Sequence, residues 1–278
     1  MSVSFAARPS LSLLYRNVDP RLCHKPSITR ASSSAISHTL SPVSQRRQSS
    51  SSSSSIMSES TPQRGFEKPA LFVCDIQEKF RNAIYEFDKV VSTTTKLLRF
   101  AHALSIPIYI TTQTRTKLGE TVSELQAFLT TKDGGGGGGG GGGPHPLVAA
   151  DLDKTLFGMY TPALASLFNS SPSSVPSHIA LVGIESHICV TQTCLALRKK
   201  HPDTKIYVIA DGVSSCNREE VPVALARLRQ EGVTVTTSEG WMYECMGDAG
   251  IREFREVVRI VKETGEGTRE ALRGLAKI

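Results

Sequence analysis

Two polar side chains stand where an enzyme built on a parallel sheet needs them. Asp75 ends the apolar run of residues 71–74, so it is expected at the end of a strand, partly shielded from water. Cys189 follows a second apolar run and precedes a helix-like segment, residues 191–200. The dipole and the free N–H groups of a helix N-terminus favour a thiolate over a thiol. These positions predict a nucleophilic cysteine with a carboxylate nearby.

A third residue, Lys154, completes a possible catalytic set. A thiol needs a base to take its proton, and a carboxylate that an ammonium group holds in place can serve as that base. Taken one at a time, each residue has a simpler explanation. Free cysteines are usually buried in the core, strand-end aspartates often cap helices, and lysines are usually solvated. Only the combination predicts that Asp75, Lys154 and Cys189 act together.

The elements that must position these residues alternate along the chain from residue 70 onward. Short β-branched or aliphatic runs predict strands at residues 70–75, 107–112, 178–184, 205–210 and 234–237. Apolar residues at steps of three and four predict helices within residues 90–104, 221–228 and 251–261. This alternation predicts an α/β fold with a parallel sheet. Ligands of such sheets bind beyond the carboxyl ends of the strands, where Asp75 and Cys189 are expected.

Two segments are not expected to belong to the packed domain. Residues 132–146 contain ten consecutive glycines, and glycine loses too much backbone entropy on ordering to hold a helix or a strand. We interpret them as a flexible insertion, which a fold tolerates because the cost of loop closure grows slowly with length. The run lacks the fixed glycine offsets of a phosphate-binding loop. Residues 264–278 are predicted to form a charged C-terminal tail.

The net charge of +6 comes from the first 58 residues. They hold seven of the 32 Lys and Arg residues and one of the 26 acidic residues, which leaves 25 of each sign in the rest of the chain. The charge of the domain therefore gives no sign of a nucleic acid partner. An acid-poor leader rich in Ser and Arg, residues 1–58, predicts a mitochondrial transit peptide. The alternatives are an unstructured tail, or a cytoplasmic protein whose translation starts at Met57.

The cysteines and the hydropathy pattern exclude two further classes. Six cysteines form no Cys-x-x-Cys pair and follow no secretory signal, so reduced thiols are expected instead of a disulfide framework. No apolar run reaches the length of a membrane span. We therefore expect neither a disulfide-rich secreted domain nor a membrane protein.

Four ordered motifs resemble the isochorismatase-like cysteine hydrolase superfamily, in particular its branch of isochorismatase domain-containing proteins. They are FVCDIQEKF at 72–80, TQ at 112–113 with LG at 118–119, KTLFGM at 154–159 and GIESHICV at 183–190. The resemblance implies a single hydrolase domain over residues 68–263. It also implies a Rossmann-like three-layer α/β/α sandwich with a mostly parallel sheet.

The resemblance implies a covalent mechanism. In the family, the aspartate that matches Asp75 deprotonates the cysteine that matches Cys189, with Lys154 as the third member of the triad. The thiolate attacks a carbonyl-type carbon, and water later releases the covalent intermediate. The same match implies a cis peptide bond between Ile184 and Glu185. Backbone N–H groups there and at Cys189 are expected to form an oxyanion hole.

Other positions bear on the substrate. Phe80, Gln113 and Phe157 are expected to line its pocket, although packing alone would account for the two phenylalanines. Nicotinamidases of the superfamily carry an Asp/His metal cluster after the second strand, whereas residues 111–117 here contain neither residue type. We therefore expect no metal, no cofactor and a substrate other than nicotinamide.

Together, these observations predict a metal-independent cysteine hydrolase. Its expected partner is a small amide, imide, carbamoyl or related compound, with cleavage at a C–N bond, and neither a nucleic acid nor a membrane. Members of the superfamily commonly form oligomers, so a homo-oligomer is expected. Two alternatives remain: a catalytically quiet binding or scaffold protein that kept the fold, and a redox sensor that pairs Cys189 with Cys194 or Cys216.

Overall fold

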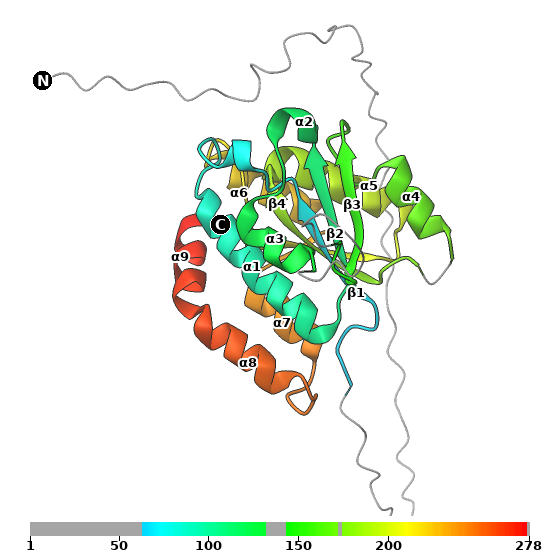
Figure 1. Cartoon of the computed structure of the whole chain (residues 1–278), viewed down its shortest axis with the longest axis vertical. Helices are drawn as coiled ribbons and strands as arrows, with labels where there is room; N and C mark the ends of the chain where they lie inside the picture. The colour runs from blue at the N-terminus through cyan, green and yellow to red at the C-terminus, as the bar shows by residue number, and fades with distance from the viewer. Residues whose placement is uncertain (1–62, 132–142, 172–173, 277–278) are drawn as a thin grey trace, which may run out of the picture. The chain divides into compact units, whose positions relative to one another are not determined.

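A six-stranded parallel sheet forms the centre of the domain (Figure 1). The computed structural model describes residues 63–131, 143–171 and 174–276. The strands are β1 (Pro69–Cys74), β2 (Ile108–Gln113), β3 (Val148–Lys154), β4 (His178–Ile184), β5 (Lys205–Ser214) and β6 (Thr234–Thr236). Their order in the sheet is β3-β2-β1-β4-β5-β6, and each neighbouring pair is parallel.

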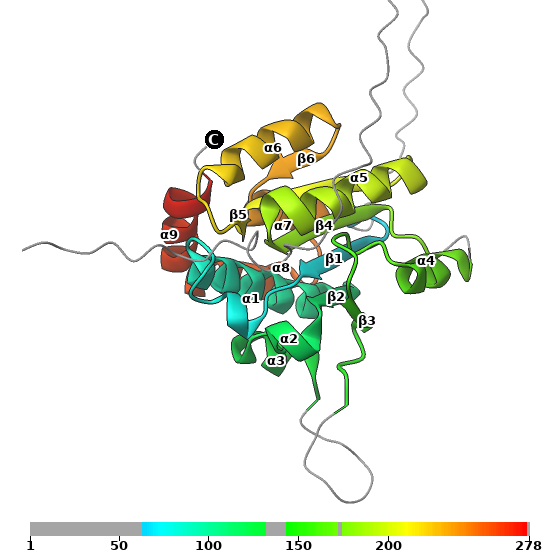
Figure 2. The same cartoon turned by 90° about the horizontal axis from the view of Figure 1, so that it is seen from above.

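Helices cover both faces of this sheet (Figure 2). One face packs against α1 (Phe87–Leu104), α7 (Ser238–Met246) and α9 (Gly265–Leu275), with α3 (Ser123–Leu129) and α8 (Phe254–Glu263) beside α1. The other face packs against α4 (Pro162–Asn169), α5 (Thr191–Lys200) and α6 (Glu220–Gln230). Short helical segments follow three strands: η2 (Glu78–Phe80), α2 (Arg115–Leu118) and η3 (Ser186–Val190). The predicted three-layer α/β/α sandwich is confirmed.

β1 shows why the central strands are near-continuous apolar runs. It is buried along its whole length, because helices cover both faces of a parallel sheet. Phe72 and Cys74 belong to the apolar cluster that includes Phe168 of α4 and Leu197 of α5. Leu71 and Val73 point to the opposite face, as side chains alternate along a strand.

β3 is the strand that the sequence patterns do not predict. It lies at the edge of the sheet, and its burial alternates, with Ala150 and Lys154 buried between exposed residues. An edge strand that is buried on one face needs apolar residues only at alternate positions. In β3, three of the seven residues are charged, so no continuous apolar run marks the strand. Lys154 therefore ends a strand that was not among the predicted ones. The other five predicted strands are confirmed, and β5 continues to Ser214.

Residues 132–142, with most of the glycine run, and the predicted leader of residues 1–58 lie outside the described residues. Both predictions about them stay predictions. The described residues on either side of the run pair with each other, since Thr130 forms an antiparallel bridge with Pro144. The Thr131 N–H donates to the Gly143 carbonyl at 2.8 Å. The chain thus leaves and re-enters the fold at one place.

The last residues, interpreted from the sequence as a frayed, charged helix or tail, form a packed helix in the part that the structure describes. α9 packs against α1 and β5, and it buries Thr268, Ala271 and Leu275. These residues fall at helical spacing, but the charged residues between them hide the pattern in the sequence. The folded domain therefore extends through α9.

A buried ammonium group fixes α9 to the domain. Lys96 of α1 is 1% exposed, and its Nζ donates to Thr268 Oγ1 at 2.7 Å. Burial lowers the pKa of Lys96, while the negative charges of Asp211 and Glu239 act in the opposite direction. Glu239 Oε1 of α7 lies 3.7 Å from Nζ, so one side chain links three helices.

Among the residues that the structure describes, no helix combines the length and the apolar character that a membrane crossing requires.

Replacing the partner of Lys96 tests this attachment. We expect Thr268→Val to lower the free energy of unfolding by about 1–3 kcal/mol, because a buried ammonium group loses its hydroxyl acceptor. Urea denaturation of the full chain measures the change. Glu270→Ala, at an exposed site of the same helix, is the control and should change stability by less than about 0.5 kcal/mol. Equal stability of the two variants would show that this contact does not hold α9.

Candidate active site

The predicted triad lies at the carboxyl ends of the strands, near α2 in Figure 1. Asp75 follows β1, Lys154 ends β3, and Cys189 lies in η3 after β4. β1 and β4 are neighbours in the sheet, and the order of the strands reverses between them. Parallel sheets form their ligand crevices at such a switch point. The fold therefore brings Asp75 and the Cys189 turn to the place where a site is expected.

Lys154 and Asp75 form a buried ion pair. Lys154 Nζ lies 2.7 Å from Asp75 Oδ2, and the two side chains are 1% and 2% exposed. Strand register brings them together, because Lys154 pairs with Gln113 between β3 and β2, and Thr111 pairs with Cys74 between β2 and β1. Removing ions from water costs several kcal/mol each, so a buried pair needs further hydrogen bonds.

Four oxygen atoms surround the Lys154 ammonium group. Besides the carboxylate, Gln113 Oε1 accepts from it at 2.7 Å, and the carbonyl groups of Leu156 and Phe157 accept at 3.1 and 3.0 Å. An ammonium group has three hydrogens, so these acceptors occupy all of them. The Gln113 amide nitrogen donates to the Thr155 carbonyl at 3.0 Å. Both polar ends of the Gln113 side chain are thus engaged, one with Lys154 and one with Thr155. Its expected place in the lining of the substrate pocket stays a prediction.

These surroundings keep Lys154 positively charged. Burial alone lowers the pKa of Lys154, but the charges of Cys74, Asp75 and Cys189 and the hydrogen bond to Asp75 outweigh it and raise the pKa above 10.5. A thiol contributes charge only when it is ionised, so Asp75 is the partner that acts at neutral pH. Lys154 therefore serves as a fixed positive charge and not as a proton acceptor.

The Asp75 carboxylate is held at both oxygens. Thr111 Oγ1 donates to Oδ1 at 2.7 Å, and Lys154 binds Oδ2. The φ angle of Asp75 is 53°, in the left-handed region that residues other than glycine rarely adopt. On the adjacent strand, Gly183 has a φ of 116°, and a Cβ there would lie 2.0 Å from the Cys74 carbonyl oxygen. Only glycine lets β4 approach the end of β1 so closely.

Cys189 lies in a π-helical turn, η3, that leads directly into α5. Single π turns are frequent at functional sites. A second thiol, that of Cys74, is in hydrogen-bonding contact with Cys189. Its Sγ also lies 3.6 Å from Asp75 Oδ2. Burial raises the pKa of Cys74 well above its ordinary value, and the hydrogen-bonding contact with Cys189 and the charge of Asp75 raise it further. Cys74 is therefore a neutral thiol next to both the carboxylate and the candidate nucleophile.

Sequence reasoning missed the place of Cys74. Regular alternation along a strand puts neighbouring side chains on opposite faces, so Cys74 and Asp75 were not expected to meet. The left-handed conformation of Asp75 breaks that alternation. Thr111 was missed as well, although the strand register that places it beside the carboxylate follows from the parallel sheet.

The peptide bond between Ile184 and Glu185 is cis, as the resemblance implied. The Glu185 side chain is buried, and its Oε2 accepts from the Cys216 backbone N–H at 2.8 Å. The Glu185 carbonyl accepts from the N–H groups of Ile188 and Val190, each at 3.1 Å. These bonds fix the backbone around Cys189 from two directions.

The two phenylalanines that were expected to line the substrate pocket differ in their surroundings. Phe80 of η2 is buried, and packing accounts for it. Phe157 is 43% exposed and follows Leu156, which is also exposed. An apolar area therefore lies on the surface beside the loop whose carbonyl groups bind Lys154.

Near the ends of β2 and β3, Arg115 binds two aspartates, one through its guanidinium group and one through its backbone N–H. Arg115 Nη2 donates to Asp151 Oδ1 at 2.5 Å, and the Arg115 backbone N–H donates to Asp153 Oδ1 at 2.8 Å.

Within residues 63–131, 143–171 and 174–276, no three His, Cys, Asp or Glu side chains gather as metal ligands would. The expected absence of a metal stays a prediction.

Removing one member of the ion pair should cost more than removing both. We expect Lys154→Met to lower the free energy of unfolding by about 3–5 kcal/mol, because Asp75 is left as an uncompensated buried charge. The double variant Asp75→Asn/Lys154→Met should lose less. Urea denaturation at neutral pH measures both, with Lys117→Met at an exposed site of α2 as control. A single variant as stable as that control would contradict a buried ion pair.

The stabilisation by Lys154 should also depend on pH in one direction. Folding raises the pKa of Lys154 above 10.5, so its contribution is fully present below that pH and is lost as the pH rises through the folded-state pKa. The difference in unfolding free energy between wild type and the double variant should stay constant from about pH 8 to 10 and shrink above that range. Urea denaturation at stepped pH measures it. A difference that shrinks below about pH 9 would contradict a raised pKa.

Known proteins resemble this chain over most of the folded domain. Residues 69–240 match the isochorismatase domain. The chain is 36% identical over 199 residues to isochorismatase domain-containing protein 2 of Xenopus laevis, a match that covers 72% of this chain and 86% of the relative.

Solved structures share the fold. The MAR1 ribonuclease of Caenorhabditis elegans aligns with a TM-score of 0.59 at 31% identity, over 70% of this chain and 90% of that chain. The YcaC gene product of Escherichia coli, described as an octameric hydrolase of unknown specificity, aligns with a TM-score of 0.58 at 16% identity, over 74% and 92% of the two chains. At 16% identity, the likeness to the YcaC gene product concerns the fold alone. Since the domain match spans more than half of the sequence, the chain belongs to the isochorismatase family.

Proposed function

We propose that the protein is a cysteine hydrolase that cleaves a C–N bond in a small amide, imide, carbamoyl or related compound. The observation that carries the proposal is the buried Lys154–Asp75 pair, 2.7 Å between charged atoms, next to the two thiols. Burying two charges costs free energy that an apolar pair would not. A catalytic role for the carboxylate explains why the fold keeps them.

The proposed reaction proceeds in two halves. Asp75 takes the proton from Cys189 Sγ, and the sulfur attacks the carbonyl carbon of the substrate. The C–N bond then breaks, and the leaving nitrogen takes the proton back from Asp75. In the second half, a water molecule gives a proton to Asp75 and attacks the thioester carbon. Sulfur leaves, regains that proton, and the acid product departs.

Lys154 and Gln113 position the base in this scheme. Because the ammonium hydrogens are committed to oxygen acceptors, the lysine stays charged and the proton moves on Asp75 alone. We assign the oxyanion hole to backbone N–H groups around Ile184 and Glu185 and at Cys189. One such donor typically contributes about 3 kcal/mol to transition-state stabilisation.

The alternatives receive less support. Cys194, one suggested partner for a redox sensor, is enclosed in the core, and burial raises its pKa, which disfavours the reactive thiolate. A ribonuclease, as the Caenorhabditis elegans protein is described, needs a cationic surface for phosphates. The 25 charges of each sign beyond residue 58 supply no net positive charge. A catalytically quiet binding protein is separated from a hydrolase by experiment.

Two further proposals concern the whole protein. We propose a homo-oligomer, for which the exposed Leu156 and Phe157 offer apolar area, and light scattering of the purified chain tests it. We propose mitochondrial import from the leader composition. N-terminal sequencing of the native protein tests that proposal, and a start near Met57 in the cytosol would end it.

Substitution of the nucleophile tests the hydrolase. Among small amides and carbamoyl compounds, we expect turnover that falls by about 10³-fold or more in Cys189→Ala, because the covalent step is lost. Cys194→Ala removes a neighbouring buried thiol and should stay within about tenfold of wild type. Mass spectrometry should find an acyl adduct on the Cys189 peptide. Turnover that survives Cys189→Ala would exclude the covalent mechanism.

If no compound is turned over, alkylation measures the reactivity of the Cys189 thiol directly. Iodoacetamide should modify Cys189 faster than Cys216, and Asp75→Asn should slow the reaction at Cys189 because its base is lost. Equal rates at the two cysteines, together with no turnover, would favour the quiet binding protein.

A further inference from the structure

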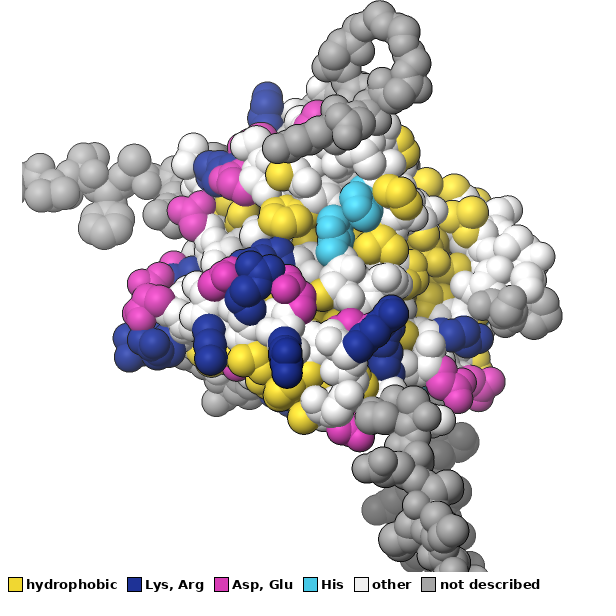
Figure 3. All heavy atoms as spheres, turned by 60° about the horizontal axis from the view of Figure 1, so that its bottom comes forward, with side chains coloured by type: hydrophobic (Ala, Val, Ile, Leu, Met, Phe, Trp, Pro, Cys, Tyr) yellow, Lys and Arg dark blue, Asp and Glu magenta, His cyan; other side chains and the backbone are white. Residues whose placement is uncertain are grey.

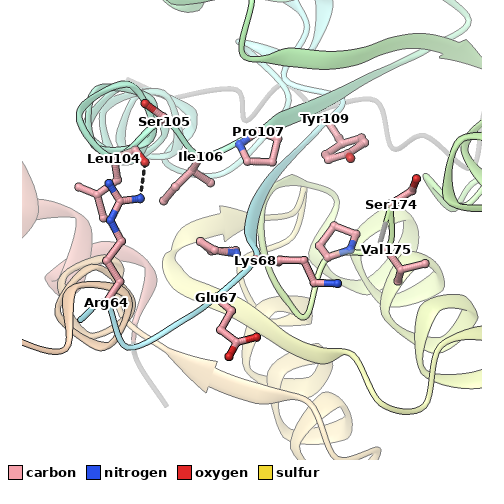
Figure 4. A pocket seen from close by; sticks show the side chains of 12 residues that line it. Arg64, Glu67, Lys68, Leu104, Ser105, Ile106, Pro107, Tyr109, Ser174 and Val175 are labelled. Atoms are coloured by element: carbon pink, nitrogen blue, oxygen red, sulfur yellow. Dashed lines mark hydrogen bonds between the residues drawn. The ribbon is translucent and has the colours of Figure 1, made fainter. Parts of the chain in front are cut away.

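A pocket of about 280 Å³ lies at the opposite end of the sheet from the candidate active site (Figure 4). Residues ahead of β1 and β2 line it, together with the chain between α4 and β4. The active-site residues follow the far ends of the same strands, six residues away along β1, which is about 20 Å at 3.3 Å per residue. Apolar side chains gather on this end of the molecule (Figure 3). The pocket is therefore separate from the site described above.

The walls of the pocket combine apolar side chains with charged and hydroxyl-bearing ones. Leu104 and Ile106 contribute buried hydrocarbon. Pro69, Pro107 and Pro176 also line it, and proline fixes its own φ angle and has no N–H to offer. The pocket is thus preformed by the backbone. Its volume lies close to the lower end of the range for ligand sites, about 300–1,000 Å³, so it suits a small molecule.

Tyr109 brings a hydroxyl group to this apolar pocket. Its ring packs against Phe72 and Phe168, with centroids 4.8 and 5.8 Å apart, and the residue is only 9% exposed. Figure 4 shows the hydroxyl on the side of the ring that faces the pocket. Among the described residues, no hydrogen-bond partner meets it. The hydroxyl oxygen is not among the fully enclosed, unpartnered polar atoms of the described residues, so a ligand in the pocket could reach it.

The Tyr109 hydroxyl remains a donor across the physiological pH range. Burial raises the pKa of Tyr109 above its ordinary value of 10.0, because the charged phenolate would be shielded from water. A neutral hydroxyl can both donate and accept, and its O–H is available to a ligand group that accepts a hydrogen bond.

Lys68 adds a positive charge to a pocket that the Glu67 carboxylate also lines. The Arg64 guanidinium donates to the Leu104 carbonyl at 2.6 Å and to Glu253 Oε1 at 2.8 Å, an oxygen that it shares with Arg252. Lys68 is exposed, and within the part of the chain that the structure describes its ammonium group has no ion-pair or hydrogen-bond partner. One uncommitted cation is left at the rim.

Lys68, Tyr109 and Ser174 gather on one side of the pocket, while Arg64 and Ser105 lie on the other side beside Leu104 (Figure 4). In Figure 4, Lys68, Tyr109 and Ser174 lie around Val175, while the Glu67 carboxylate points away from Pro107. A ligand with its charge at one end and hydrocarbon at the other would match this division. The charge must be negative, because the groups that face it are an ammonium group and hydroxyls.

We propose that this pocket binds a small organic monocarboxylate with an aromatic or branched hydrocarbon body. The body packs against Ile106, Pro107 and Val175. The carboxylate accepts hydrogen bonds from the Tyr109 hydroxyl and the Lys68 ammonium group. This site does not depend on the reaction proposed for Cys189.

Benzoate is the probe that tests the proposal on the full chain. With ¹³C-labelled tyrosine in the protein, the Tyr109 NMR signal, identified by its loss in Tyr109→Phe, should shift in a saturable way with a Kd of about 10 mM or lower. Saturation-transfer titrations should find benzoate binding about tenfold weaker in Tyr109→Phe, since the ring remains and one hydrogen bond to a charged group is lost. Circular dichroism confirms that this conservative variant is folded.

Two controls separate the carboxylate from the hydrocarbon. Benzyl alcohol has the same ring without the charge, and Lys68→Met should weaken benzoate about fivefold while leaving benzyl alcohol unchanged. Lys117→Met, an exposed lysine at the other end of the sheet, should change neither. The affinity for benzoate should fall with added salt in wild type and much less in Lys68→Met.

Three results would overturn the proposal. The first is a Tyr109 signal that does not move with benzoate. The second is benzoate affinity that is the same in wild type, Tyr109→Phe and Lys68→Met. The third is loss of benzoate binding when Cys189 is alkylated, which would place the probe in the candidate active site.

Discussion

A buried ammonium group requires hydrogen-bond acceptors within reach. The Lys154 ammonium group finds them only if β1, β2 and β3 keep their positions relative to one another. Its acceptors come from the residue after β1, the last residue of β2 and the loop after β3. Ions removed from water lose several kcal/mol of solvation each, so a shift of any one strand would leave a charge exposed to hydrocarbon. The pairing of Gln113 with Lys154 meets this demand. Lys154 thus specifies the register of the edge strand, which its own few apolar residues do not.

The same demand determines how β1 ends. A regular strand would direct Cys74 and Asp75 to opposite faces, and here Cys74 keeps its place in the core shared with α4 and α5. Asp75 leaves the strand with a φ of 53°, a conformation that costs about 1–3 kcal/mol. The ion pair with Lys154 and the hydrogen bond from Thr111 offset that cost. The result is a carboxylate in contact with a neutral thiol, beside the turn that carries Cys189.

The central strands could be predicted because burial on both faces makes them continuous apolar runs, as in β1 and β4. β3 could not, since an edge strand needs apolar side chains on one face only and its buried end is a lysine. The motifs linked Asp75 to Lys154 across 79 positions, which no local periodicity does. The meeting of Cys74 with Asp75 depends on one backbone angle that periodicity does not encode. In α9, charged residues hide the three buried positions that dock it.

The two ends of the sheet differ in the hydrogen-bonding groups that their backbones expose. Prolines at or just ahead of the starts of β1, β2 and β4 have no N–H that requires a partner, so the chain there can form an apolar wall. Packing with Phe72 and Phe168 requires an aromatic ring at position 109. A phenylalanine would satisfy that packing, and the tyrosine adds a hydroxyl that meets no described residue and borders the pocket. The core therefore explains the ring of Tyr109, whereas its oxygen is the group that the proposed ligand would use.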